Sequence, residues 1–110
     1  MEVESRMITM LRRHFDHPSK FAVEGALCKM LTDDGRRCAV GQVAHELGVP
    51  DSTLKYWNLM DNEEVDVHEA LSPVSQKFIR QVRTAHDLAR RDPDRFGYAL
   101  TVIAAGLTER

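Results

Sequence analysis

The sequence has little of several features that define whole classes of protein. Its 110 residues include only 2 cysteines, 4 prolines and 6 glycines, and the formal charge is -2 at pH 7. So few cysteines argue against a disulfide-stabilised secreted fold, and so little proline and glycine argues against a disordered or collagen-like chain. The near balance of charge gives no global attraction to nucleic acid or to an anionic membrane, so binding to either would need a local patch.

Long apolar runs are also missing. The longest, from Tyr98 to Leu107, has about half of the roughly 20 residues that a membrane-spanning helix needs. The N-terminal stretch 1–15 is broken by charged residues and lacks the apolar core of a signal peptide. We therefore expect no membrane segment, a cytoplasmic location and reduced thiols.

What the sequence does have is the composition of a packed domain, with 43% hydrophobic and 29% charged residues. Apolar residues recur at helical spacing along most of the chain, which predicts an all-α fold. We expect a single compact domain, residues 1–110, of about five or six helices. The N-terminal helix should end near His17, and further helices are expected over residues 19–31, 38–47 and 51–60.

Two serine- or aspartate-proline pairs predict the starts of the last two helices, because proline is favoured at the first helical position. The longest helix should follow Ser72-Pro73, and a final helix should follow Asp92-Pro93 and end at Gly106. Residues 61–69, which precede the Ser72-Pro73 pair, are acidic and weakly periodic. We expect them to form a loop or a short, frayed helix. The apolar arc predicted for the longest helix comprises Val74, Phe78, Val82, Ala85, Leu88 and Ala89. The cations expected to lie outside this arc are Lys77, Arg80, Arg83, Arg90 and Arg91.

Residues 40–57 have the spacing of a helix-turn-helix, with small Ala44 at the expected helix crossing and Gly48 at the turn. The stretch resembles the start of MerR-like and excisionase-like regulators. That resemblance implies a recognition helix in the DNA major groove. Its groove-facing residues would be Ser52, Thr53, Lys55 and Tyr56.

The charge of this stretch argues against DNA. Contacts to phosphate dominate affinity for a duplex, yet residues 51–69 carry six acidic side chains against the single base Lys55. MerR-like proteins usually offer arginines and a basic wing here, which this sequence lacks. A helix-turn-helix angle also occurs as plain packing, so both interpretations stay open. If the chain does bind DNA, Lys77, Arg80 and Arg83 would have to supply much of the phosphate contact.

A second resemblance overlaps the first. The block Phe21-Ala-Val-Glu-Gly25-Ala-Leu27, followed by Asp34-Gly35-Arg-Arg-Cys38-Ala-Val-Gly41, is similar to a family of small uncharacterised phage and actinobacterial proteins. Gly48, Pro50 and Trp57 also match, so the similarity covers residues 21 to 62. After Asn62 the chain departs from the family pattern, because two well-capped helices follow. The resemblance implies a phage or mobile-element accessory protein and no catalytic residue.

The residues of this block also have a structural interpretation. Gly25 and Gly41 lie inside helical patterns, which suggests a close approach between the helices at 19–31 and 38–47. Cys38 is expected to be a small buried residue beside that crossing.

The sequence offers little for catalysis or metal binding. Cys28, Cys38 and His45 have no C-x-x-C spacing, so we expect no metal site. Cys38 and His45 stand two helical turns apart, too far for a thiolate–imidazole pair, and no catalytic residue is assigned.

The sequence therefore predicts a non-enzymatic binding protein without cofactor, whose partner is a host or phage protein. The alternatives are a helix-turn-helix DNA-binding regulator and, more remotely, a cysteine-dependent enzyme. A homodimer is also compatible with the sequence. The candidate binding residues are Ser52, Thr53, Lys55, Tyr56, Lys77, Arg80 and Arg83.

Overall fold

The computed structural model of the chain describes residues 2–15, 23–24, 27–28, 30–89, 92 and 94–108. The fold is all-α, as predicted, and the described part adds only one pair of two-residue strands. The helices are α1 (Glu2–His14), α2 (Ala39–Glu46), α3 (Asp51–Trp57), α4 (Asn62–Asp66), α5 (Gln76–Ala89) and α6 (Asp94–Thr108). A 3-10 turn, Glu69–Leu71, precedes α5.

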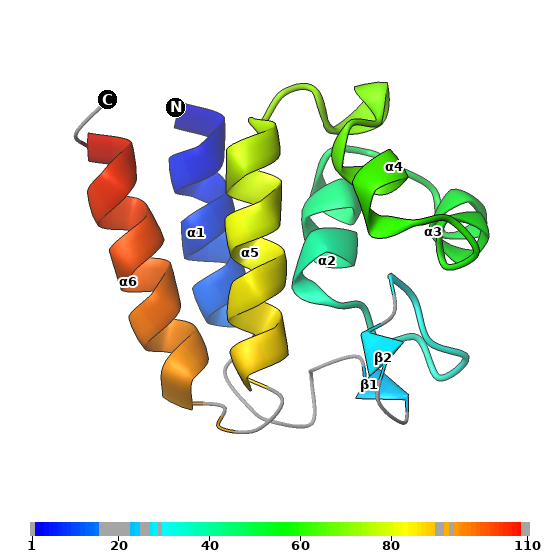
Figure 1. Cartoon of the computed structure of the whole chain (residues 1–110), viewed down its shortest axis with the longest axis horizontal. Helices are drawn as coiled ribbons and strands as arrows, with labels where there is room; N and C mark the ends of the chain where they lie inside the picture. Colours follow the sequence, from blue (N-terminus) through cyan, green and yellow to red (C-terminus); the bar gives the residue numbers. More distant parts are fainter. Residues whose placement is uncertain are drawn as a thin grey trace.

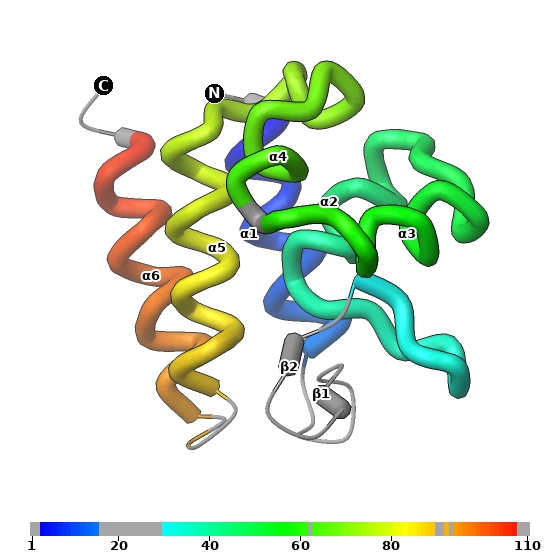
Figure 2. Tube along the Cα trace, turned by 45° about the vertical axis from the view of Figure 1, so that its right-hand side comes forward, coloured from blue at the N-terminus to red at the C-terminus, as the bar shows by residue number. Residues whose placement is uncertain are grey.

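The helices form two groups along the longest dimension of the molecule (Figure 1). Helices α1, α5 and α6 run side by side in one half, and α2 joins them by packing against α1 and α5. Helices α3 and α4 lie in the other half. Both views place α6 and α3 at opposite ends (Figures 1 and 2).

The prediction of a helix over residues 19–31 is wrong for the part of this segment that the structure describes. Strands β1 (Val23–Glu24) and β2 (Leu27–Cys28) pair there in antiparallel register, and residues 30 and 31 form a bend. Phe21 and Gly25, which belong to the same expected helix, lie outside the described residues.

Asn58 explains why the chain is not helical at the end of this segment. Its side-chain oxygen accepts a hydrogen bond from the Met30 backbone N–H at 2.8 Å, and its amide nitrogen donates to the Leu31 carbonyl at 2.9 Å. These two bonds replace the partners that a helix would provide for the backbone groups. A turn at residues 32–35 follows, with Gly35 at a φ of 88°.

Gly41 marks a close backbone approach, as predicted, although its neighbour is the bend and not a helix. A Cβ on Gly41 would lie 2.9 Å from the Met30 carbonyl carbon, and nearer still to its oxygen. Cys38 is buried beside this contact, as expected, and its sulfur accepts a hydrogen bond from the Gly41 N–H at 3.3 Å. Cys38 therefore caps the N-terminus of α2.

Helix α5 begins later than the Ser72-Pro73 pair predicted. Residues 72 and 73 form a turn, and α5 begins at Gln76 after Ser75, whose hydroxyl accepts from the Phe78 N–H at 3.0 Å. Buried Glu4 of α1 accepts from the Ser75 N–H at 2.7 Å. A carboxylate at this position satisfies a free donor and suits the positive end of the helix dipole, so a contact from α1 helps to set the start of α5.

The other helix boundaries follow local signals more closely. Asp92 accepts from the Asp94 N–H at 3.2 Å, so the predicted cap of α6 is present, and α6 continues two residues beyond Gly106 to Thr108. Between α2 and α3, Gly48 takes a φ of 95°, and the Val49 N–H donates to the Ala44 carbonyl at 3.0 Å. No helix within the described residues is long and apolar enough to span a membrane.

Candidate protein-binding groove

Three large apolar side chains are exposed together along α5 and α6. Leu88 of α5 is 46% exposed, and Tyr98 and Val102 of α6 are 74% and 54% exposed. Leu88 belongs to the apolar arc predicted for this helix, but unlike the other members of the arc it is exposed. The part of α5 that other elements cover is narrower than its apolar face. Leu88 lies at the edge of that face, where α6 does not cover it.

These side chains border a groove of about 650 Å³ between the two helices. Ala85, Ala99 and Ile103, which are buried or half-buried, also line it. The described residues that line it are Lys77, Arg80, Gln81, Thr84, Ala85, Leu88, Arg95, Tyr98, Ala99, Val102 and Ile103.

The described charged residues of the groove all have one sign. Lys77, Arg80 and Arg95 are exposed, and none of the described residues lining the groove is acidic. The guanidinium of Arg80 is 3.7 Å from the Asp66 carboxylate, and that of Arg95 is 3.5 Å from Asp92. Both contacts are long and both arginine side chains are exposed, although Asp66 itself is buried, so the two guanidinium groups can still meet a ligand.

Of the three α5 cations predicted as binding residues, the structure brings Lys77 and Arg80 to the groove. Arg83 differs, since its side chain is only 12% exposed and forms an ion pair with buried Asp66 of α4. Helix α4 packs beside α5 at this point (Figure 2). Arg83 therefore fastens α4 to α5 and does not line the groove.

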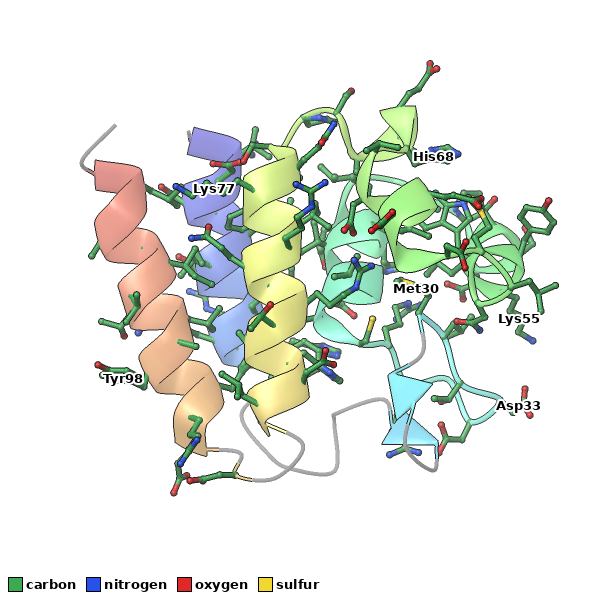
Figure 3. The ribbon with its side chains drawn as sticks, in the orientation of Figure 1. Met30, Asp33, Lys55, His68, Lys77 and Tyr98 are labelled. Atoms are coloured by element: carbon green, nitrogen blue, oxygen red, sulfur yellow. The ribbon has the colours of Figure 1, made fainter. Side chains whose placement is uncertain are left out.

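The four candidate residues on α3 form a separate surface. Ser52, Lys55 and Tyr56 are exposed, and Thr53 is half-buried. Leu54 and Trp57 on the opposite face of this helix are buried and anchor it to the core. In Figure 3 Lys55 lies at the opposite end of the molecule from Tyr98, so the structure does not join the α3 surface to the groove.

The electrostatics around α3 are mixed. Arg37 donates to the Asp51 carboxylate at 2.8 Å, and this hydrogen bond lowers the Asp51 pKa below its ordinary value of 3.8. Arg37 is thus engaged within the protein at neutral pH. The exposed acids Asp61, Glu63 and Glu64 follow α3 in the chain. Lys55 is therefore the exposed cation that α3 itself offers to a duplex.

We find no metal-binding cluster in the described part of the chain. It holds no group of three or more histidine, cysteine or acidic side chains placed to bind a metal ion. Cys38 is buried and acts as a helix cap, while His45 is exposed and 3.9 Å from Asp51. The Cys28 side chain lies outside the described residues.

Arg95, Tyr98 and Val102 were not among the predicted site residues. Tyr98 and Val102 lie four residues apart on α6, so they share one face, while Phe96, Leu100 and Ile103 are buried on another. A helix with apolar residues on two faces was the available signal.

Comparison with protein-family models, with curated proteins and with solved structures gives no match for this chain.

Proposed function

We propose that this protein is a non-enzymatic binding module that holds a segment of another protein in the groove between α5 and α6. The observation that carries the proposal is the shared exposure of Leu88, Tyr98 and Val102 around one groove. Small soluble proteins rarely leave several large apolar side chains together in water, and such patches are typical of interaction sites. An exposed tyrosine beside aliphatic residues and arginine is also a common composition of binding surfaces.

The resemblance of residues 21 to 62 to phage and actinobacterial proteins supports a more specific form of the proposal. In it, the protein is a phage or mobile-element accessory factor that acts in the cytoplasm of a bacterial host, and the segment belongs to a host protein. The groove lies outside the resembling block, so its partner can be specific to this chain.

A selection from random peptides tests the groove. Peptides of roughly four helical turns would be displayed and selected on the immobilised full-length protein. We expect enriched sequences that bind the wild type and lose at least about tenfold in affinity to Val102→Glu, because a charge there must be desolvated when an apolar ligand binds. Leu59→Glu is the matched control, since Leu59 is 84% exposed but follows α3, away from the groove.

Both variants alter exposed residues, so both should keep the wild-type circular dichroism spectrum and melting temperature. Enriched peptides that bind Val102→Glu and the wild type equally, or no enriched peptide at all, would contradict the proposal. Peptides that bind Val102→Glu but not Leu59→Glu would place the binding site in the α3–α4 half of the molecule.

DNA binding by α3 is the second candidate function. The exposure of Ser52, Lys55 and Tyr56 favours it, because a recognition helix must present such residues to a base edge. Fluorescence anisotropy with random and genomic duplexes over a salt titration, beside Lys55→Glu, tests it. Affinity that falls steeply with salt and is lost in the variant would support DNA binding, and no binding at low salt would reject it.

A further inference from the structure

The shape of the groove indicates what kind of segment it holds, if the proposed function is correct. Its walls are two antiparallel helices in contact along their length (Figure 1). On α5 the lining residues run from Lys77 to Leu88, and on α6 from Arg95 to Ile103, at intervals of one helical turn. Two ridges with this spacing form a straight channel, into which a third helix can pack its own ridge.

The length of the channel follows from helix geometry. Lys77 and Leu88 are eleven positions apart on α5, which corresponds to about 16 Å, or three turns, at 1.5 Å per residue. Along this length the exposed apolar side chains lie toward the Leu88 end, with Tyr98 and Val102 opposite. A ligand helix of three turns would present apolar residues at positions i, i+3 or i+4, and i+7.

The cations lie at the two ends of this channel. Lys77 is near the start of α5 and Arg95 near the start of α6, and these starts are at opposite ends because the helices are antiparallel (Figure 3 labels Lys77). Arg80 lies one turn from Lys77. Among the described residues no ion pair holds Lys77, which leaves its ammonium group for a ligand carboxylate. A complementary segment would thus carry acidic residues on both sides of its apolar positions.

We infer that the groove binds a short amphipathic helix, about three turns long, whose apolar face is flanked at both ends by acidic residues. A nucleic acid fits less well, because it offers a phosphate at every nucleotide. Between the cations at its two ends the described lining of this groove is uncharged and mostly apolar, with Gln81, Thr84, Ala85 and Leu88 on α5 and Tyr98, Ala99, Val102 and Ile103 on α6.

The peptide selection described above also supplies the test. Aligned sequences of the enriched, groove-dependent peptides should show apolar residues at i, i+3 or i+4 and i+7, with Asp or Glu before and after them. A labelled peptide made to that consensus would then be compared with a version in which each terminal acid is replaced by lysine. We expect the acidic peptide to bind the wild type about tenfold more tightly.

A charge-reversed protein makes the comparison sharper. Lys77→Glu combined with Arg95→Glu should weaken the acidic peptide about tenfold and strengthen the lysine version, and Lys55→Glu at the far end of the molecule should change neither. The affinity of the acidic peptide should also fall as salt is raised.

The outcomes separate the two proposals. Groove-dependent peptides that lack acidic ends, or that bind equally after charge reversal, would overturn the acidic-helix inference and leave the proposed function standing. Peptides that remain non-helical in the complex by circular dichroism would overturn it as well. Absence of any peptide sensitive to Val102→Glu would remove both proposals, as would a groove filled by a second copy of the chain, seen as self-association that Val102→Glu abolishes.

Discussion

Gly41→Ala should destabilise the protein, although alanine normally strengthens a helix. The added Cβ would lie 2.9 Å from the carbonyl carbon and 3.0 Å from the Cα of Met30, closer than real Cβ contacts allow. The atoms in the way are backbone, so no side-chain rotation relieves the overlap. Either α2 or the bend at residues 30 and 31 has to move.

The magnitude can be worked from three contributions. Replacing glycine by alanine inside a helix gains about 1 kcal/mol, and overpacking a close contact costs roughly 1–3 kcal/mol. Moving the bend also strains the two hydrogen bonds from Asn58, each of which contributes about 1 kcal/mol. The net loss in the free energy of unfolding should be about 2 kcal/mol, which lowers the melting temperature by roughly 8 °C in a domain of this size.

Gly97→Ala is the matched control. Gly97 lies inside α6, is exposed, and a Cβ there would meet nothing within 4 Å. This variant should gain about 0.5–1 kcal/mol from helix propensity alone.

Urea unfolding followed by the fluorescence of the single tryptophan, Trp57, measures both variants, because Trp57 is buried and becomes exposed on unfolding. If Gly41→Ala were as stable as the wild type, the close approach of α2 to the bend would be refuted.

Three further substitutions test contacts elsewhere. Asn58→Ala should lower the free energy of unfolding by about 2–3 kcal/mol, since it leaves two backbone groups of the bend unsatisfied, and a loss under about 0.5 kcal/mol would argue against the clamp. Cys38→Ala should lower the free energy of unfolding by about 1 kcal/mol, because it removes the cap of α2, and Cys38→Ser should lower it less. A larger loss for Cys38→Ser in urea unfolding would contradict the capping role. Asp66→Asn should lower the free energy of unfolding by about 2 kcal/mol, because the mostly buried Arg83 guanidinium then lacks its charge partner. Asp92→Asn removes the charge from an exposed pair and should change the free energy of unfolding very little. Equal effects of the two variants in urea unfolding would contradict this difference.

The sequence predicted those parts of the fold whose signals are local. The turn between α2 and α3 depends on Gly48, and the start of α6 depends on Asp92, so both could be read from a few neighbouring residues. The segment before α2 could not, because its backbone partner is the Asn58 side chain, 27 and 28 positions away from the two residues that it binds. The start of α5 similarly involves Glu4, 71 positions from Ser75.

The groove could be predicted only in part, because its exposed residues also depend on elements distant in the sequence. Charge alone pointed to Lys77 and Arg80, since cations on a helix are exposed whatever covers the other face. The same argument was wrong for Arg83, because α4 places the buried Asp66 against it and leaves its side chain only 12% exposed. Leu88 is similar, since its exposure depends on how much of α5 is covered by α6. Helical periodicity shows on which face of a helix an apolar side chain lies. It does not show how much of that face a neighbouring helix covers.

The exposed apolar residues of α5 and α6 contribute little to the packing of the core, and this bears on why the groove is there. Phe96, Leu100 and Ile103 are buried and already anchor α6 against the rest of the protein. Tyr98 and Val102 add apolar surface that folding leaves in water, where it lowers solubility without adding stability. Such residues are more readily explained by a partner that covers them, so substitutions at these positions should change binding while leaving the free energy of unfolding unaltered.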